Sequence, residues 1–133
     1  MSPPPTGLQD LAQRYTAAWC SQSAASVAAF YSPNGSLCIN GGTLARGREA
    51  IITSVQEFMT AFPDLHVHMD NLIVQGDDVV YHWTLTGANT GPGGSGKSVR
   101  ITGFETWKLS PHGLIAESQG TFDHADYQRQ LLA

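Results

Sequence analysis

The stretch GDDVVYHWTLTGANTGPGGSGKSVRITGFETWKL, residues 76–109, decides the fold. It holds two runs, Asp78–Asn89 and Lys97–Leu109, that are rich in β-branched and aromatic residues and alternate apolar with polar positions, as half-buried strands do. The connection between them is short and rich in glycine, so we expect antiparallel neighbours. Further strands are expected over Leu65–Gln75 and Leu114–Phe122. This half of the chain therefore predicts an antiparallel meander.

The first half of the chain carries helical periodicity instead. Leu8, Leu11, Tyr15 and Trp19 recur at helical spacing after TGLQ (6–9), which fits a capping box. The other elements expected are a short helix over Ala24–Tyr31, a turn at SPNG (32–35), a strand over Ser36–Asn40, a helix over Gly47–Phe62 and a last helix over Asp123–Leu132. Helices followed by a meander predict an α+β fold in which helices cover a curved sheet, with space for a ligand between them.

The composition sets limits on the class of protein. A chain of 133 residues is long enough for one domain, expected over residues 7–133 after a flexible leader at 1–6. A hydrophobic fraction of 41% argues against disorder, and no apolar run approaches the roughly 20 residues of a membrane span. The net charge is −4 and the seven Lys and Arg are scattered, which argues against nucleic acid as a partner. Without a recognisable secretion signal, we expect a cytoplasmic protein.

One nucleotide-binding pattern is present but out of context. Residues 91–98, GPGGSGKS, fit G-x-x-x-x-G-K-[ST], which cradles phosphates when it opens into a helix. Here the alternating run VRITGFETW follows, which predicts a strand. We therefore expect this segment to be a loop between two strands.

Neither the cysteines nor the histidines predict a metal site. Cys20 and Cys38 stand alone, without a CxxC spacing, and are expected to be small buried residues. His66, His68 and His82 fall on the strand positions that alternate away from the pocket, on the outer face of the sheet. We expect neither metal nor cofactor.

Two residues on the inward faces could carry chemistry. Glu105 alternates with the apolar residues Ile101 and Trp107, and desolvation there would raise its pKa toward the range useful for proton transfer. The alternative is that the strand twists and Glu105 reaches water or a cation. Tyr15 lies one turn before Trp19 on the buried stripe of the first helix, where a tyrosine is often simply part of the core.

The order of elements and several short phrases resemble the nuclear transport factor 2-like superfamily, most strongly its SnoaL-like polyketide cyclases, and next the ketosteroid isomerases. The resemblance extends from Leu8 to Leu131 and implies a cone-shaped curved sheet. The phrases that carry it are GREAI (47–51), FPDL (62–65), GDDVV (76–80), WTLTG (83–87), GK (96–97) and GLIAE (113–117).

The resemblance implies roles for three residues. Tyr15 and Glu105 fall near the positions of the two groups that, in ketosteroid isomerase, donate to the substrate oxygen. The general base of that enzyme corresponds to residues 38–40 of this chain, which hold no carboxylate. In SnoaL-like cyclases an aspartate after the last strand is the acid and base, closing a ring by an intramolecular aldol reaction without metal or organic cofactor. Asp123 matches that position, although aspartate is also a favoured helix N-cap.

The leading hypothesis is a cofactor-independent cyclase or isomerase acting on a small apolar carbonyl compound, with Asp123 as acid and base and with Glu105 and Tyr15 polarising the carbonyl. The second hypothesis is a binding domain that holds a ligand through Tyr15 and Asn40 without turnover. Epoxide hydrolysis is disfavoured, because Arg100 lacks the two aspartate partners it would need. The superfamily also implies a homodimer through the outer sheet face. The residues expected to bind the ligand are Trp19, Asn40, Phe58, Tyr81, Trp83 and Trp107.

Overall fold

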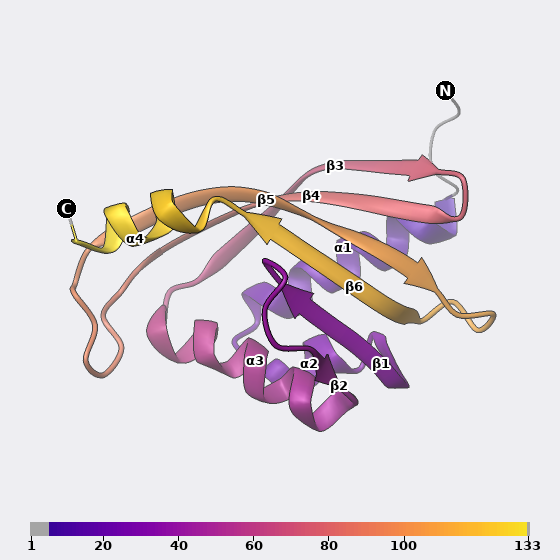
Figure 1. The fold of residues 1–133 in the computed structure, drawn as a ribbon, viewed down its shortest axis with the longest axis horizontal. Helices are drawn as coiled ribbons and strands as arrows, with labels where there is room; N and C mark the ends of the chain where they lie inside the picture. Colours follow the sequence, from indigo (N-terminus) through magenta and orange to yellow (C-terminus); the bar gives the residue numbers. More distant parts are fainter. Residues whose placement is uncertain (1–5, 133) are drawn as a thin grey trace.

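The computed structural model describes residues 6–132 (Figure 1). The leader predicted for residues 1–6 lies outside the described residues except for Thr6, with which the first helix begins. The elements are α1 (Thr6–Cys20), α2 (Ala24–Ala28), β1 (Tyr31–Ile39), β2 (Ala45–Arg46), α3 (Arg48–Ala61), β3 (His66–Gln75), β4 (Asp78–Ala88), β5 (Ser98–Leu109), β6 (Ile115–Phe122) and α4 (His124–Leu132).

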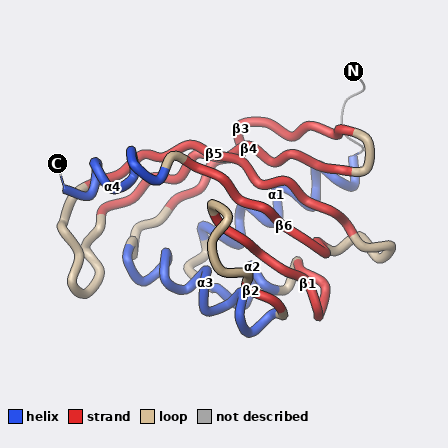
Figure 2. The backbone as a smooth tube through the Cα atoms, viewed as in Figure 1, coloured by secondary structure: helices blue, strands red, loops and turns tan. Residues whose placement is uncertain are grey.

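The strands form one curved sheet in the order β2-β1-β6-β5-β4-β3. Helices α1, α2 and α3 lie on one side of it, and α4 runs along the far end of β5 (Figures 1 and 2). The predicted α+β class with a curved sheet and covering helices is confirmed. No helix of residues 6–132 is long and apolar enough to cross a membrane.

The sheet departs from the prediction at β1. This strand pairs in parallel with β6, whereas the other pairs are antiparallel. A parallel pair needs a long connection, and α3 with the whole meander lies between β1 and β6 in sequence. The SPNG segment predicted as a turn lies within β1, where the register shifts between Tyr31 and Ser36. The strand β2 was missed because two residues are too short to alternate.

The interior lies between the concave face of the sheet and the helices. As strand alternation predicted, the inward positions of β4 and β5 are buried, among them Tyr81, Trp83, Ile101 and Trp107. Gly103 makes room for Trp83, since a Cβ at residue 103 would lie 2.7 Å from Cζ2 of the indole. The absence of that Cβ lets the indole lie across β5.

The glycine-rich segment is a loop between β4 and β5, as expected from the strand that follows it. It packs against the end of α3, where a Cβ at Gly91 would lie 2.0 Å from the carbonyl oxygen of Thr60. The Asn89 side chain adds a hydrogen bond of 3.1 Å to the Ala61 carbonyl oxygen. Gly91 is therefore explained by packing of the loop on a helix.

Candidate functional site

Within residues 6–132, one carboxyl group lies deep in the interior. Glu105 is in the middle of β5, opposite Tyr81 of β4 and Gly120 of β6, and is 7% exposed. The alternation of β5 turns it inward together with Ile101 and Trp107, so the alternative in which it reaches water is excluded.

Three donors converge on one oxygen of this carboxyl. Glu105 Oε1 accepts from Ser118 Oγ at 2.7 Å, from Trp107 Nε1 at 3.0 Å and from the Tyr15 hydroxyl at 3.0 Å. Its other oxygen, Oε2, has a longer contact of 3.3 Å with the same Tyr15 hydroxyl, and Tyr31 also interacts with this carboxyl. Oε2 is therefore the oxygen with bonding capacity left for a ligand.

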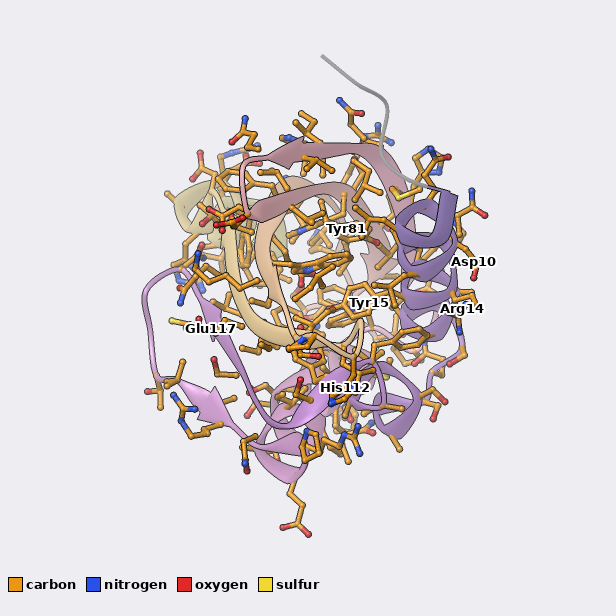
Figure 3. All side chains as sticks on the ribbon, turned by 90° about the vertical axis from the view of Figure 1, so that its right-hand side faces the viewer. Asp10, Arg14, Tyr15, Tyr81, His112 and Glu117 are labelled. Carbon is orange, nitrogen blue, oxygen red and sulfur yellow. The ribbon has the colours of Figure 1, made fainter. Side chains whose placement is uncertain are left out.

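A pair of tyrosines lies behind Glu105. The Tyr15 hydroxyl donates to Glu105 at 3.0 Å and lies 2.9 Å from the Tyr31 hydroxyl, and either hydroxyl of the pair could be the donor to the other. Figure 3 shows the strands curving round an interior filled by side chains, with Tyr15 reaching in from α1 beside Tyr81. The ring centroids of Tyr15 and Tyr81 are 5.5 Å apart.

Burial controls the protonation of these groups. Desolvation raises the pKa of Glu105 above its ordinary value of about 4.5, while the hydrogen bonds from Trp107, Ser118 and the tyrosines act in the opposite direction. Desolvation, with the charge of Glu105, raises the pKa values of Tyr15 and Tyr31 well above 10. Both tyrosines therefore stay protonated near neutral pH and act as donors.

Glu105 forms part of the wall of an apolar cavity. Water-sized spheres can occupy about 50 Å³ of it, so a ligand larger than a few waters requires wall side chains to shift. Beyond it lies a second, open hollow of about 540 Å³, which shares Leu37, Ile39 and Phe58 with the cavity. The cavity is lined by Trp19, Leu37, Ile39, Phe58, Val67, Tyr81, Trp83, Leu85, Ile101, Glu105, Gly120 and Phe122.

The predicted ligand-binding residues divide into two groups. Trp19, Phe58, Tyr81 and Trp83 line the cavity beside Glu105. Trp107 stands behind the carboxyl, where it donates to Oε1 and stacks on Tyr81 with ring centroids 4.9 Å apart.

Asn40 and Asp123 are not among the residues that line the cavity, and both are exposed. Asn40 accepts a hydrogen bond of 2.9 Å from the backbone N–H of Phe122. Asp123 Oδ1 accepts one of 3.0 Å from the backbone N–H of Asp126, in the first turn of α4. Both side chains thus hold backbone at the end of β6, and Asp123 serves as an N-cap.

Sequence reasoning missed Ser118 and Tyr31 as members of the site. Both are fully buried. Ser118 alternates inward with Phe122 on β6 and lies opposite Trp107, so its position on an otherwise apolar face was a usable signal. Tyr31 had been read as the end of a helix, and only the bulged start of β1 brings it to Tyr15.

The outer face of the sheet carries the histidines, as predicted. His66 and His68 are exposed and His82 is half-buried. No group of three or more His, Cys, Asp and Glu within residues 6–132 could hold a metal ion. Cys20, which lies between α1 and β3, donates to the Val67 carbonyl oxygen at 3.2 Å.

The homodimer expected through the outer face of the sheet stays a prediction.

These features match a known family. The sequence model of the SnoaL-like polyketide cyclases matches residues 9–131, and the chain belongs to that family. No curated protein matches it.

Solved structures share the fold. A protein from Jannaschia sp. CCS1 named as a SnoaL-like polyketide cyclase is 23% identical, with a TM-score of 0.84 over 100% of this chain and 96% of that one. A protein with a ketosteroid isomerase-like fold from Catenulispora acidiphila, in complex with trimethylamine, is 15% identical, with a TM-score of 0.81 over 98% and 94% of the two chains. The epoxide hydrolase/cyclase-like enzyme SalBIII, of pyran ring formation in the polyether salinomycin, is 16% identical, with a TM-score of 0.77 over 90% and 93%.

Proposed function

We propose that this protein is a cofactor-independent cyclase or isomerase that moves a proton on a small, apolar carbonyl compound, with Glu105 as the acid and base. The observation that carries the proposal is a buried carboxyl in the wall of an apolar cavity, with three donors on Oε1 and capacity left on Oε2. Membership of the SnoaL-like polyketide cyclase family supports it.

The surroundings of Glu105 suit a group that must both take and return a proton. Burial favours the neutral acid, while the donors Tyr15, Trp107 and Ser118 stabilise the carboxylate. A carboxyl held between these influences has its pKa moved toward neutral pH, where general acid–base catalysis is most efficient. The acid–base role that the family resemblance gave to Asp123 passes to Glu105, because Asp123 is exposed and caps α4.

The proton transfer is simple to write. The Glu105 carboxylate removes a proton from the carbon next to the carbonyl, and the C–H electron pair forms the C=C bond of an enolate while the carbonyl π pair moves to oxygen. In an isomerisation Glu105 returns the proton to another carbon. In a cyclisation the enolate carbon attacks a second carbonyl, and Glu105 protonates the alkoxide that forms. No external oxidant or reductant takes part in either route.

The test is hydrogen–deuterium exchange at the carbon next to the carbonyl. Cyclic ketones that raise the melting temperature of the protein are incubated with it in D₂O, and loss of the proton signal is followed by NMR. We expect Glu105→Gln to lose exchange and to keep ligand-induced stabilisation, because an amide cannot return a proton near neutral pH.

Two variants serve as comparisons. Asp123→Asn is expected to exchange at the wild-type rate, and Glu117→Gln, an exposed glutamate on β6, controls for the loss of a charge. Loss of exchange in Asp123→Asn with exchange retained in Glu105→Gln would return the acid–base role to Asp123. Stabilisation by ketones with no exchange in the wild type would favour the second candidate, a domain that binds a ligand without turnover.

A further inference from the structure

One residue of the cavity wall carries a polar atom that has no protein partner. Within residues 6–132 the buried side-chain nitrogen and oxygen atoms without a hydrogen bond are Trp83 Nε1 and Ser32 Oγ. Of these two residues only Trp83 lines the cavity, and it is 9% exposed. A buried N–H left without an acceptor costs about 1–3 kcal/mol, so such a group in a binding cavity calls for an acceptor on the ligand.

The other donors near the carboxyl are already engaged. The hydroxyl of Tyr15 donates to Glu105, and Trp107 Nε1 donates to the same carboxyl. The Tyr81 hydroxyl lies 2.5 Å from Thr16 Oγ1. Tyr15 and Trp107 are also absent from the cavity wall. These groups hold the acid and base in place, and the indole N–H of Trp83 is the buried donor of a cavity-lining residue that has no protein acceptor.

The sheet places Trp83 next to Glu105. Trp83 pairs with Gly103 and Tyr81 pairs with Glu105 across β4 and β5, so Trp83 and Glu105 are diagonal neighbours on the inward face. Diagonal Cα positions in an antiparallel pair are about 7–8 Å apart, within reach of long side chains. Because Gly103 has no Cβ, the indole lies over β5, the strand that carries Glu105.

We propose that Trp83 Nε1 donates a hydrogen bond to the carbonyl oxygen of the substrate, while Glu105 Oε2 faces the carbon beside that carbonyl. This inference rests on the proposed function. Proton removal moves negative charge onto the carbonyl oxygen, and a fixed donor at that oxygen stabilises the charge as it develops. The group recognised at Trp83 is thus a ketone or ester oxygen, attached to a body without other polar groups inside the cavity.

The experiment uses the indole N–H signals in a ¹⁵N-correlated proton spectrum. The chain has three tryptophans, and Trp83→Phe identifies the Trp83 signal by its loss. The probes are cyclohexanone and methylenecyclohexane, which share shape but differ in having an oxygen or a CH₂ group. We expect cyclohexanone to move the Trp83 proton signal downfield, as a new hydrogen bond does. Methylenecyclohexane should compete for the cavity without that downfield shift.

Three outcomes overturn the inference. One is an equal response of the Trp83 signal to both probes. Another is a Trp83 signal already downfield without ligand and unchanged by cyclohexanone, since a bound water would then be the acceptor. The third is no response of any indole signal up to the solubility limit of both probes, since the cavity would then not admit a carbonyl compound of this size.

Kinetics separate this inference from the proposed function. Trp83→Phe should lower the exchange rate of a bound ketone about 100-fold, as loss of one donor to a developing oxyanion does, and should lower ligand-induced stabilisation by a smaller factor, because the hydrogen bond to the neutral ketone is weaker than the one to the oxyanion. Exchange that depends on Glu105 but proceeds at the wild-type rate in Trp83→Phe would refute the inference and keep the proposed function. A downfield shift at Trp83 with no exchange in any protein would keep the binding role and refute the catalytic one.

Discussion

Two acidic residues, one in the middle of β5 and one at the end of β6, show how position decides the chemistry of a carboxyl. Glu105 is buried, receives three hydrogen bonds on one oxygen and has a raised pKa. Asp123 is exposed and accepts one backbone N–H at the start of α4. The first is placed to exchange a proton with a ligand and the second to hold a helix end. The predictions below test that contrast by removing each group or changing its charge.

The largest effect is expected from Glu105→Ala. The substitution leaves Trp107 Nε1 and Ser118 Oγ buried without their acceptor, and each unsatisfied buried group costs about 1–3 kcal/mol. We therefore expect the free energy of unfolding to fall by about 3 kcal/mol, measured by urea denaturation. Glu105→Gln keeps an acceptor oxygen and should lose less than half as much. Equal losses in the two variants would show that the donors on Oε1 contribute little.

The next effect is a pH dependence that belongs to Glu105. Its folded-state pKa is raised above the ordinary value of about 4.5, so its contribution to stability is complete below that pH and is lost as the pH rises through the folded-state pKa. The free energy of unfolding of the wild type, relative to Glu105→Gln, should therefore decrease with rising pH. The slope is at most about 1.4 kcal/mol per pH unit, the value for one proton.

Urea denaturation of both proteins over a pH series that rises from about 4.5, the ordinary pKa of a glutamate, measures this difference. The other titrating groups are common to the two proteins and cancel. A difference that rises with pH would mean that the hydrogen bonds outweigh desolvation and that the pKa of Glu105 is lowered.

Much of this contrast could be predicted from residue patterns, because alternation and helical spacing report which face a side chain occupies. They placed Glu105, Tyr81 and Trp83 on the inward face of the sheet and Tyr15 on the buried stripe of α1, and the structure confirms those positions. What they do not report is which side chains meet across the interior. The bonds from Ser118 and Tyr15 to Glu105 join residues 13 and 90 positions apart.

The errors have the same origin. The parallel pairing of β1 with β6 brings the bulged start of β1, and with it Tyr31, to Tyr15, and no local pattern at residues 31–36 indicates that pairing. The position of Asp123 after the last strand was correct, but an aspartate at this position fits both a cap and a catalytic group. Only the exposure of the side chain and its bond to Asp126 distinguish the two.

The smallest effect is expected at Asp123, and it completes the contrast. Asp123→Ala removes the side-chain acceptor for the Asp126 N–H and should lower the free energy of unfolding by about 1 kcal/mol, typical for loss of an N-cap. Asp123→Ser, which keeps a capping oxygen without a charge, should restore most of it. Because a cap acts on α4 and not on the cavity, ketone-induced stabilisation should be the same in both variants as in the wild type. A larger loss of unfolding free energy in Asp123→Ser than in Asp123→Ala would contradict the role of Asp123 as a cap. Loss of ketone binding in either variant would assign the Asp123 carboxylate to the ligand site.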